Sequence, residues 1–112
     1  MADAYKTGLD HLRGGRYFAA HEDLELVWRA ADPEERDFYQ GLVHVAVAWY
    51  QAGRGNEVGA GRQLEKALRR LAGYEPAHGG LDVAGLRRQL EHAQEIVRGG
   101  SLILPPPRLE AA

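Results

Sequence analysis

One stretch constrains the fold more than any other: from Phe38 to Tyr50 the chain is apolar on almost every side of a helix. A helix of this kind is normally the buried one of its domain, because apolar surface needs neighbours on every side that it covers. Gly41 lets a neighbouring helix approach closely, and we expect the small residues 59–61 to make that approach. No apolar run reaches the roughly 20 residues of a membrane span. The stretch therefore predicts the central helix of a helical bundle.

The start of this helix is clearly marked in the sequence. Asp32 suits the N-cap, Pro33 suits the first helical position, and Glu35 completes a capping box with Asp32. Turn residues begin again at Gly53. We therefore expect the central helix at Pro33–Ala52.

Helical spacing of apolar residues predicts four more helices. Two precede the central one, at Ala4–Arg13 and Tyr17–Ala31, and two follow it, after N-caps at Asn56 and Asp82. Short turns favour antiparallel neighbours. The expected fold class is all-α: a single-domain bundle of about five antiparallel helices, packed as helical hairpins in the manner of tetratricopeptide arrays but without a visible internal repeat.

The remaining segments are expected to be irregular. Ala72–Gly80 contains several Gly and Pro residues and predicts a loop. Residues 1–100 are expected to form the bundle, and residues 101–112 an extended, Pro-rich tail. The Leu102–Leu104 segment of that tail should lie over the body or over a partner, because three exposed aliphatic side chains in a row are unfavourable.

Composition excludes several classes of protein. The chain has 112 residues, which suits one domain with one core. It has no cysteine, so disulfides and thiol catalysis are excluded. Thr7 and Ser101 are its only hydroxyl residues besides tyrosine, which excludes serine-hydrolase chemistry. The formal charge of -2 argues against nucleic acid as a partner.

Residue usage and charge pattern also predict the location, the source and the surface of the protein. The start, MADAYKTGLD, lacks the basic and apolar regions of a signal peptide, so we expect a soluble cytoplasmic protein with no membrane partner. Scarcity of asparagine, lysine and hydroxyl residues favours a thermophilic source. The arginines in the second half of the chain interleave with glutamates, which predicts a solvated, salt-bridged surface.

The candidate site lies on the central helix and on the helix before it. Its residues are His21, Glu25, Trp28, Gln40 and His44. The first three are spaced i, i+4 and i+7, so their side chains are neighbours in series on one helix. The other two belong to a narrow polar stripe, with Gln51, on an otherwise apolar helix. The pattern predicts a polar and aromatic cluster between the two helices.

Two interpretations of this cluster remain open. A buried pair of His21 and Glu25, hydrogen-bonded to the central helix, would lock the two helices together, since buried polar groups must be satisfied. Alternatively, the cluster lines a modest ligand site. The stripe of Gln40, His44 and Gln51 either faces this pair or is the solvent-facing strip of the central helix.

A metal site is a further alternative, although no cofactor is expected. The segment His21–Glu25 is similar to the zinc motif HExxH, with Glu25 in place of the second histidine. A catalytic zinc takes three protein ligands and a water, so His44 would have to supply the third. In this case Glu22 would be the acid or base.

The stretch YFAAHEDLELVW, followed by QGLVHVAVAWY and RGNEVGAGRQL, resembles the bacterial family called domain of unknown function 309. That family's pattern is an aromatic residue, then His-Glu with a second Glu three residues on, then Trp, a Gln-Gly-Leu helix and a Gly-Asn turn. The matching positions are Phe18, His21, Glu22, Glu25, Trp28, Gln40, Gly41, Leu42, Gly55 and Asn56. The resemblance spans about Tyr5 to Leu90 and implies an all-helical fold. It implies no activity.

These observations favour a small, non-catalytic helical binding or interaction module. They identify no catalytic residue. A homo-oligomer or a protein partner is expected, because five short helices are not expected to cover Trp49 and Tyr50 fully. The alternative is a small metal-dependent, hydrolase-like enzyme with His21 and Glu25 as ligands.

Overall fold

Helix α3 (Pro33–Gly53) lies at the centre of the computed structural model, as its apolar sequence predicts. The structure describes residues 2–112. The buried residues of α3 are Phe38, Gly41, Leu42, Val43, Val45, Ala46, Ala48, Trp49 and Ala52. They pack between α2 and α4, which flank α3.

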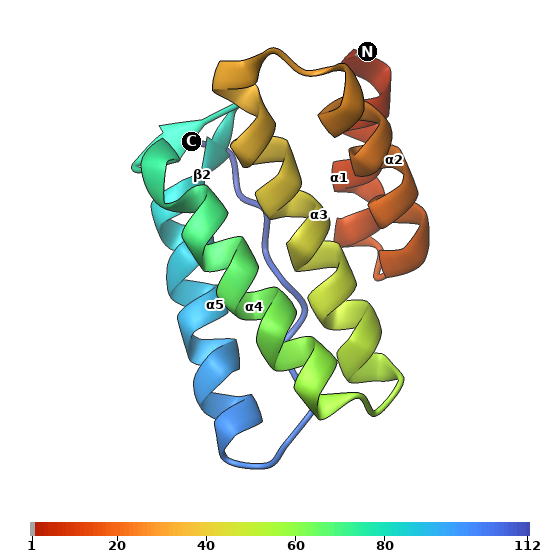
Figure 1. Cartoon of the computed structure of the whole chain (residues 1–112), viewed down its shortest axis with the longest axis vertical. Helices are drawn as coiled ribbons and strands as arrows, with labels where there is room; N and C mark the ends of the chain where they lie inside the picture. Colours follow the sequence, from red (N-terminus) through yellow and green to blue (C-terminus); the bar gives the residue numbers. More distant parts are fainter. Residues whose placement is uncertain (1) are drawn as a thin grey trace.

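Four more helices surround α3: α1 (Ala2–Arg13), α2 (Tyr17–Ala30), α4 (Glu57–Leu71) and α5 (Val83–Arg98). Consecutive helices along the chain run antiparallel to one another (Figure 1). Helix α1 packs on α2, and α5 packs on α4. The predicted all-α bundle of five helices is confirmed. Within residues 2–112, no helix is both long and apolar enough to cross a bilayer.

Two of the predicted N-caps are confirmed by their side chains. Asn56 Oδ1 accepts a hydrogen bond of 2.9 Å from the Gly59 N–H at the start of α4. Asp82 Oδ1 accepts one of 2.9 Å from the Gly85 N–H at the start of α5. Each bond satisfies a backbone donor that has no partner inside its helix.

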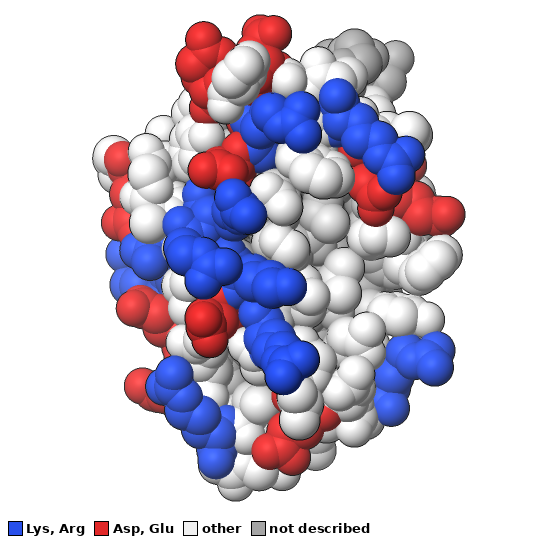
Figure 2. All heavy atoms as spheres, viewed as in Figure 1, with Lys and Arg blue, Asp and Glu red and all other residues white. Residues whose placement is uncertain are grey.

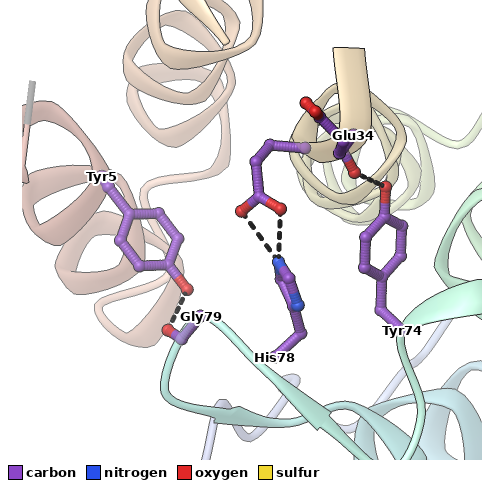
Figure 3. Close-up of polar contacts among 6 residues, drawn as sticks. Tyr5, Glu34, Tyr74, His78 and Gly79 are labelled. Carbon is purple, nitrogen blue, oxygen red and sulfur yellow. Dashed lines mark hydrogen bonds and ion pairs between the residues drawn. The ribbon is translucent and has the colours of Figure 1, made fainter. Parts of the chain in front are cut away.

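The capping box predicted at the start of α3 is wrong. Asp32 precedes the helix, but its side chain makes no cap hydrogen bond. The carboxylate of Glu35 is engaged elsewhere: its oxygens lie 2.8 Å and 3.0 Å from His78 Nε2. Figure 3 shows this contact between α3 and the segment that precedes α5. A bond to an imidazole from a distant segment therefore replaces the local one.

The predicted loop Ala72–Gly80 contains short regular elements. A 3₁₀ turn, η1 (Ala72–Tyr74), extends α4. It is followed by an antiparallel hairpin of β1 (Ala77–His78) and β2 (Leu81–Asp82). The strands are two residues long, too short for sequence alternation to reveal them.

Two tyrosine hydroxyls also tie this connection to the helices (Figure 3). The Tyr5 hydroxyl of α1 donates to the Gly79 carbonyl at 2.8 Å, and the Tyr74 hydroxyl donates to the Glu34 carbonyl at 2.7 Å. Burial raises the pKa of Tyr5, so its phenol remains a donor at any physiological pH. The hairpin is thus held against the N-terminal ends of α1 and α3.

Helices α3 and α4 approach closely at Gly41, as predicted, but the part of α4 that contacts Gly41 is not the predicted one. A Cβ atom added to Gly41 would lie 2.7 Å from Leu71 Cγ, near the end of α4. The expected contact with residues 59–61 is wrong, because antiparallel packing sets the first half of α3 beside the second half of α4. Gly61 instead lies nearest to Val97 of α5.

The tail runs back along the bundle, antiparallel to α5 (Figure 1). Trp49 Nε1 donates to the Pro105 carbonyl at 3.0 Å. The Gln89 side chain bonds the Arg108 backbone on both sides, accepting from its N–H at 2.7 Å and donating to its carbonyl at 2.9 Å. Trp49, which we expected the five helices to leave partly uncovered, is therefore buried beneath this chain's own tail.

Candidate functional site

The predicted pair on α2 is formed. His21 Nε2 lies 2.9 Å from Glu25 Oε2, and each side chain is 27% exposed. Glu25 also accepts a bond from Arg29 one turn further along. His21 Nδ1 is buried without a hydrogen-bond partner in the described chain. The hydrogen bonds of the pair thus run along α2, and those of the described residues include none that locks it to α3.

Trp28 contacts α3 through the face of its ring. It is half-buried, and the Arg36 guanidinium carbon lies 5.3 Å from the ring centroid. This is the usual distance of a cation–π interaction. Trp28 therefore connects α2 to the first half of α3.

The polar stripe of α3 makes its hydrogen bonds toward α4. His44 Nδ1 lies 2.7 Å from Gln63 Oε1. Gln51 Oε1 accepts a bond of 3.1 Å from Asn56 Nδ2 in the turn before α4. Gln40 is half-buried. The two halves of the predicted cluster are therefore separate, one bonded along α2 and the other bonded to α4.

The structure does not bring His21, Glu25 and His44 together as metal ligands. Among the residues whose side chains are described, no group of three or more His, Asp or Glu is arranged to hold a metal ion. The physical reason is that His44 turns its Nδ1 to Gln63 on α4. Glu22 is exposed on α2. The three-ligand site that the enzyme alternative needs is not formed.

Helices α2 and α3 enclose a hollow of about 200 Å³ lined by Phe18, His21, Val47, Tyr50 and Gln51. The ring centroid of Phe18 lies 5.7 Å from that of His21 and 5.4 Å from that of Tyr50. The walls are thus two aromatic rings and a valine, with an imidazole and an amide as polar groups. Apolar walls with a few polar groups are typical of binding sites.

A second, shallow hollow of about 600 Å³ adjoins the first, because Phe18 and Tyr50 line both. Trp49 and Arg54 also line it. The Arg54 guanidinium lies 5.5 Å from the Tyr50 ring centroid and donates to the Tyr50 hydroxyl at 3.0 Å. Phe18 therefore stands beside two adjacent hollows on one face.

The sequence-based site was only partly right about this face. Of the predicted residues, His21 lines the first hollow, whereas Trp28 and His44 do not. Phe18 was missed as a wall. Tyr50 was considered, with Trp28, Tyr39 and Trp49, as an aromatic that could line a pocket, but it was not included among the predicted site residues. Helical spacing gave no signal for Phe18, because a single apolar residue on a helix surface is common and its contact with Tyr50 depends on how α2 and α3 pack.

Comparison with known proteins shows which family the chain belongs to. The family model described as domain of unknown function DUF309 matches residues 5–63, which is more than half of the chain. The chain belongs to this family. The match ends earlier than the span that we expected from the sequence.

Similar proteins within the comparison are themselves uncharacterised. An uncharacterized protein of Aquifex aeolicus is 31% identical over 97 residues, which cover 86% of this chain and 28% of that protein. Uncharacterized protein YpuF of Bacillus subtilis is 38% identical over 56 residues, which cover 49% of this chain and 32% of YpuF. The chain thus spans about a third or less of the curated relatives it matches. No solved structure matches it.

The DUF309 match places the hollow within the family's part of the chain. Residues 5–63 include most of α1, all of α2 and α3, and the first half of α4. All residues that line the first hollow fall inside this range. Helix α5 and the tail lie outside it, so the hollow is a feature of the DUF309 segment itself.

Stability should depend on pH through His44. Burial lowers its pKa, and the cations of Lys66 and Arg70 lower it further, against an opposing effect of the Gln63 hydrogen bond. The unfolded chain therefore binds the proton more readily, and the free energy of unfolding should fall as pH drops below about 6.5.

His44→Gln should remove this part of the fall, while the contributions of the other histidines stay the same. Urea midpoints of both proteins at about pH 7.5 and about pH 5.5 measure the difference. An equal fall in the two proteins would contradict the prediction.

Proposed function

We propose that this chain is a non-catalytic helical binding module whose ligand site is the hollow between α2 and α3. The observation that carries the proposal is the position of Phe18, whose side chain is 52% exposed beside a hollow lined by Val47 and Tyr50. Exposed aromatic surface is unfavourable in water, and a ligand that covers it gains that free energy.

The size of the hollow favours a single apolar side chain as its occupant. Sites for drug-sized molecules usually measure about 300–1,000 Å³. The first hollow, at about 200 Å³, is smaller than this. The adjoining hollow offers space for a second side chain from the same ligand. We therefore propose a segment of a partner protein as the ligand.

The residues around His21 support binding rather than catalysis. Cysteine is absent from the chain, and Ser101 lies on the tail, where its hydroxyl accepts a bond of 3.1 Å from the Ile103 N–H. The His21–Glu25 pair thus has no serine or cysteine beside it to activate. It is better suited to set the polarity of the hollow's rim.

Toluene, which has the shape of a phenylalanine side chain, is the probe that tests this site. In ¹⁵N-labelled protein, toluene should shift the amide signals of Phe18, Val47 and Tyr50, saturating with a Kd on the order of 1–10 mM, as expected for so few heavy atoms. Phe18→Ser should weaken binding by about fivefold, equivalent to about 1 kcal/mol.

Leu26→Ser is the matched control for this experiment. Leu26 lies on the same helix and is 59% exposed, but it lines neither hollow. Its replacement should leave toluene binding unchanged. Shifts spread over the whole chain, or equal weakening in the two variants, would overturn the proposed site.

A further inference from the structure

We propose that the partner segment is an acidic amphipathic helix. It lies along the half-buried strip of α3 formed by Gln40, His44, Val47 and Gln51, with its apolar side toward the hollow and its carboxylates toward α4. This inference rests on the proposed function, because it names the partner of the same site.

The charge on this face is carried by α4. Figure 2 shows Lys and Arg side chains gathered in a band over α4, beside a largely uncharged area over α3 and α2. The cations of α4 are Arg62, Lys66, Arg69 and Arg70. A basic row beside an apolar surface complements a ligand that combines carboxylates with apolar side chains.

Half of this row has no carboxylate partner. Arg70 pairs with Asp37 at 2.9 Å, and Arg69 lies 3.6 Å from Glu65. Arg62 and Lys66 form no ion pair with the residues whose side chains the structure describes. The salt-bridged surface that we expected from interleaved glutamates is therefore incomplete, because Glu65 is oriented toward Arg69 rather than Arg62.

The α3 strip joins the basic row to the hollow. Its His44 bonds Gln63 of α4 and lies close enough to Lys66, Arg69 and Arg70 to feel their charge, so these three cations lie along one edge of the strip. Arg62 lies further round α4, beside residues of α5. Its Val47 and Gln51 line the hollow on the α2 side. A ligand seated on the strip thus meets cations along one side and apolar surface along the other.

An amphipathic helix matches this arrangement better than other ligands. A helix laid in a groove between helices presents apolar and charged side chains on separate faces. The strip has no strand edge to pair with an extended peptide. A polyanion such as nucleic acid would meet Glu22 and Glu25 on the α2 side, and the net charge of the chain is -2. The positive charge is concentrated on α4, with Arg54 as a further cation at the second hollow, so the face complements a partner that carries carboxylates beside its apolar side chains.

Two synthetic helices of about 16 residues, with the same leucine face, test the inference. One carries Glu and the other Lys on the flanking face, and binding is measured by fluorescence anisotropy. At about 50 mM NaCl, the Glu peptide should bind about tenfold more tightly, equivalent to about 1.4 kcal/mol. The difference should shrink at about 500 mM NaCl, because salt screens exposed charges.

The variant Lys66→Glu, which reverses the cation of this row that has no ion pair and lies near His44, should reduce this preference severalfold and leave toluene binding unchanged. The control is Lys6→Glu, an exposed lysine on α1, which should keep the preference. If the reversal impairs folding, Lys66→Gln should halve or further reduce the preference. Circular dichroism checks the fold of each variant.

Other outcomes overturn the inference in distinguishable ways. Equal binding of the two peptides, with toluene still bound, refutes the acidic partner and leaves the proposed function standing. Absence of toluene binding refutes the site itself. Tighter binding of a single-stranded oligonucleotide than of the Glu peptide would identify a nucleic-acid surface instead. Sedimentation of the free protein as a dimer that loses toluene binding would identify a second copy as the occupant.

Discussion

Replacing Phe38 with alanine should lower the free energy of unfolding by about 3–5 kcal/mol. Phe38 is fully buried, and its ring centroid lies 4.7 Å from that of His78, 5.4 Å from that of Tyr74 and 6.2 Å from that of Tyr5. Alanine would leave a cavity among these rings and would remove the surface that the hairpin packs against. This loss is a large fraction of the about 5–15 kcal/mol that stabilises an ordinary domain.

The chain provides its own control, because Phe18 is its only other phenylalanine. Phe18→Ala should change stability by only about 0.5 kcal/mol, as exposed positions usually do. Urea unfolding followed by far-UV circular dichroism measures both variants, with the slope expected to stay constant. Similar losses for the two variants would contradict the separation of a structural Phe38 from a ligand-binding Phe18.

Removing residues 101–112 should lower the free energy of unfolding by about 2–4 kcal/mol, the order expected for exposing a buried leucine and part of an indole. Leu109 of the tail is 4% exposed, and Pro107 is buried as well. The Trp49 ring, 5% exposed in the complete fold, would meet water and lose its bond to Pro105. Its fluorescence emission should therefore shift to longer wavelength.

Two point variants in the full chain test whether the tail stabilises the bundle through its buried side chains. Leu109→Ala in the full chain should reproduce most of the loss, about 2–3 kcal/mol. Ile103→Ala should have almost no effect, because Ile103 is 87% exposed. Unfolding of the truncated chain at the same urea concentration as the full chain would show that the tail does not stabilise the bundle.

The tail also determines which apolar surface is left for a partner. Leu102 and Leu104 pack against the core. With Trp49 covered by the chain itself, the large hydrophobic residues that stay exposed among those described are Phe18, Leu26, Val58 and Ile103. Phe18 alone among these lines both hollows between α2 and α3. This is why we assign the proposed binding face to the two hollows beside Phe18 rather than to the surface that the tail covers.

The fold could be predicted closely from local signals. The apolar stretch around Leu42 and Val45 predicts a buried central helix, and Asn56 and Asp82 mark the starts of α4 and α5. These signals act between residues a few positions apart, so they do not depend on the rest of the fold. Helix bounds therefore agreed with the structure to within one or two residues.

The candidate site was harder to predict, because its polar residues each had several partners within reach. His21 and Glu25 pair as expected, since both are fixed on one helix at i, i+4. His44 pairs with Gln63 rather than with the α2 residues, which depends on how far α3 is rotated between α2 and α4. Periodicity does not determine this rotation when a helix is apolar on almost every side.

The sequence by itself thus determined the class of the fold, the helices, the caps of α4 and α5, and the pair on α2. Tertiary structure alone decided three features: Glu35 binds His78, the tail covers Trp49, and Phe18 packs against Tyr50 at the edge of a hollow. The physical reason is the separation along the chain of the residues that interact. Helical spacing and caps arise from neighbours along the chain, whereas these contacts join segments whose approach only the packing of the whole bundle can set.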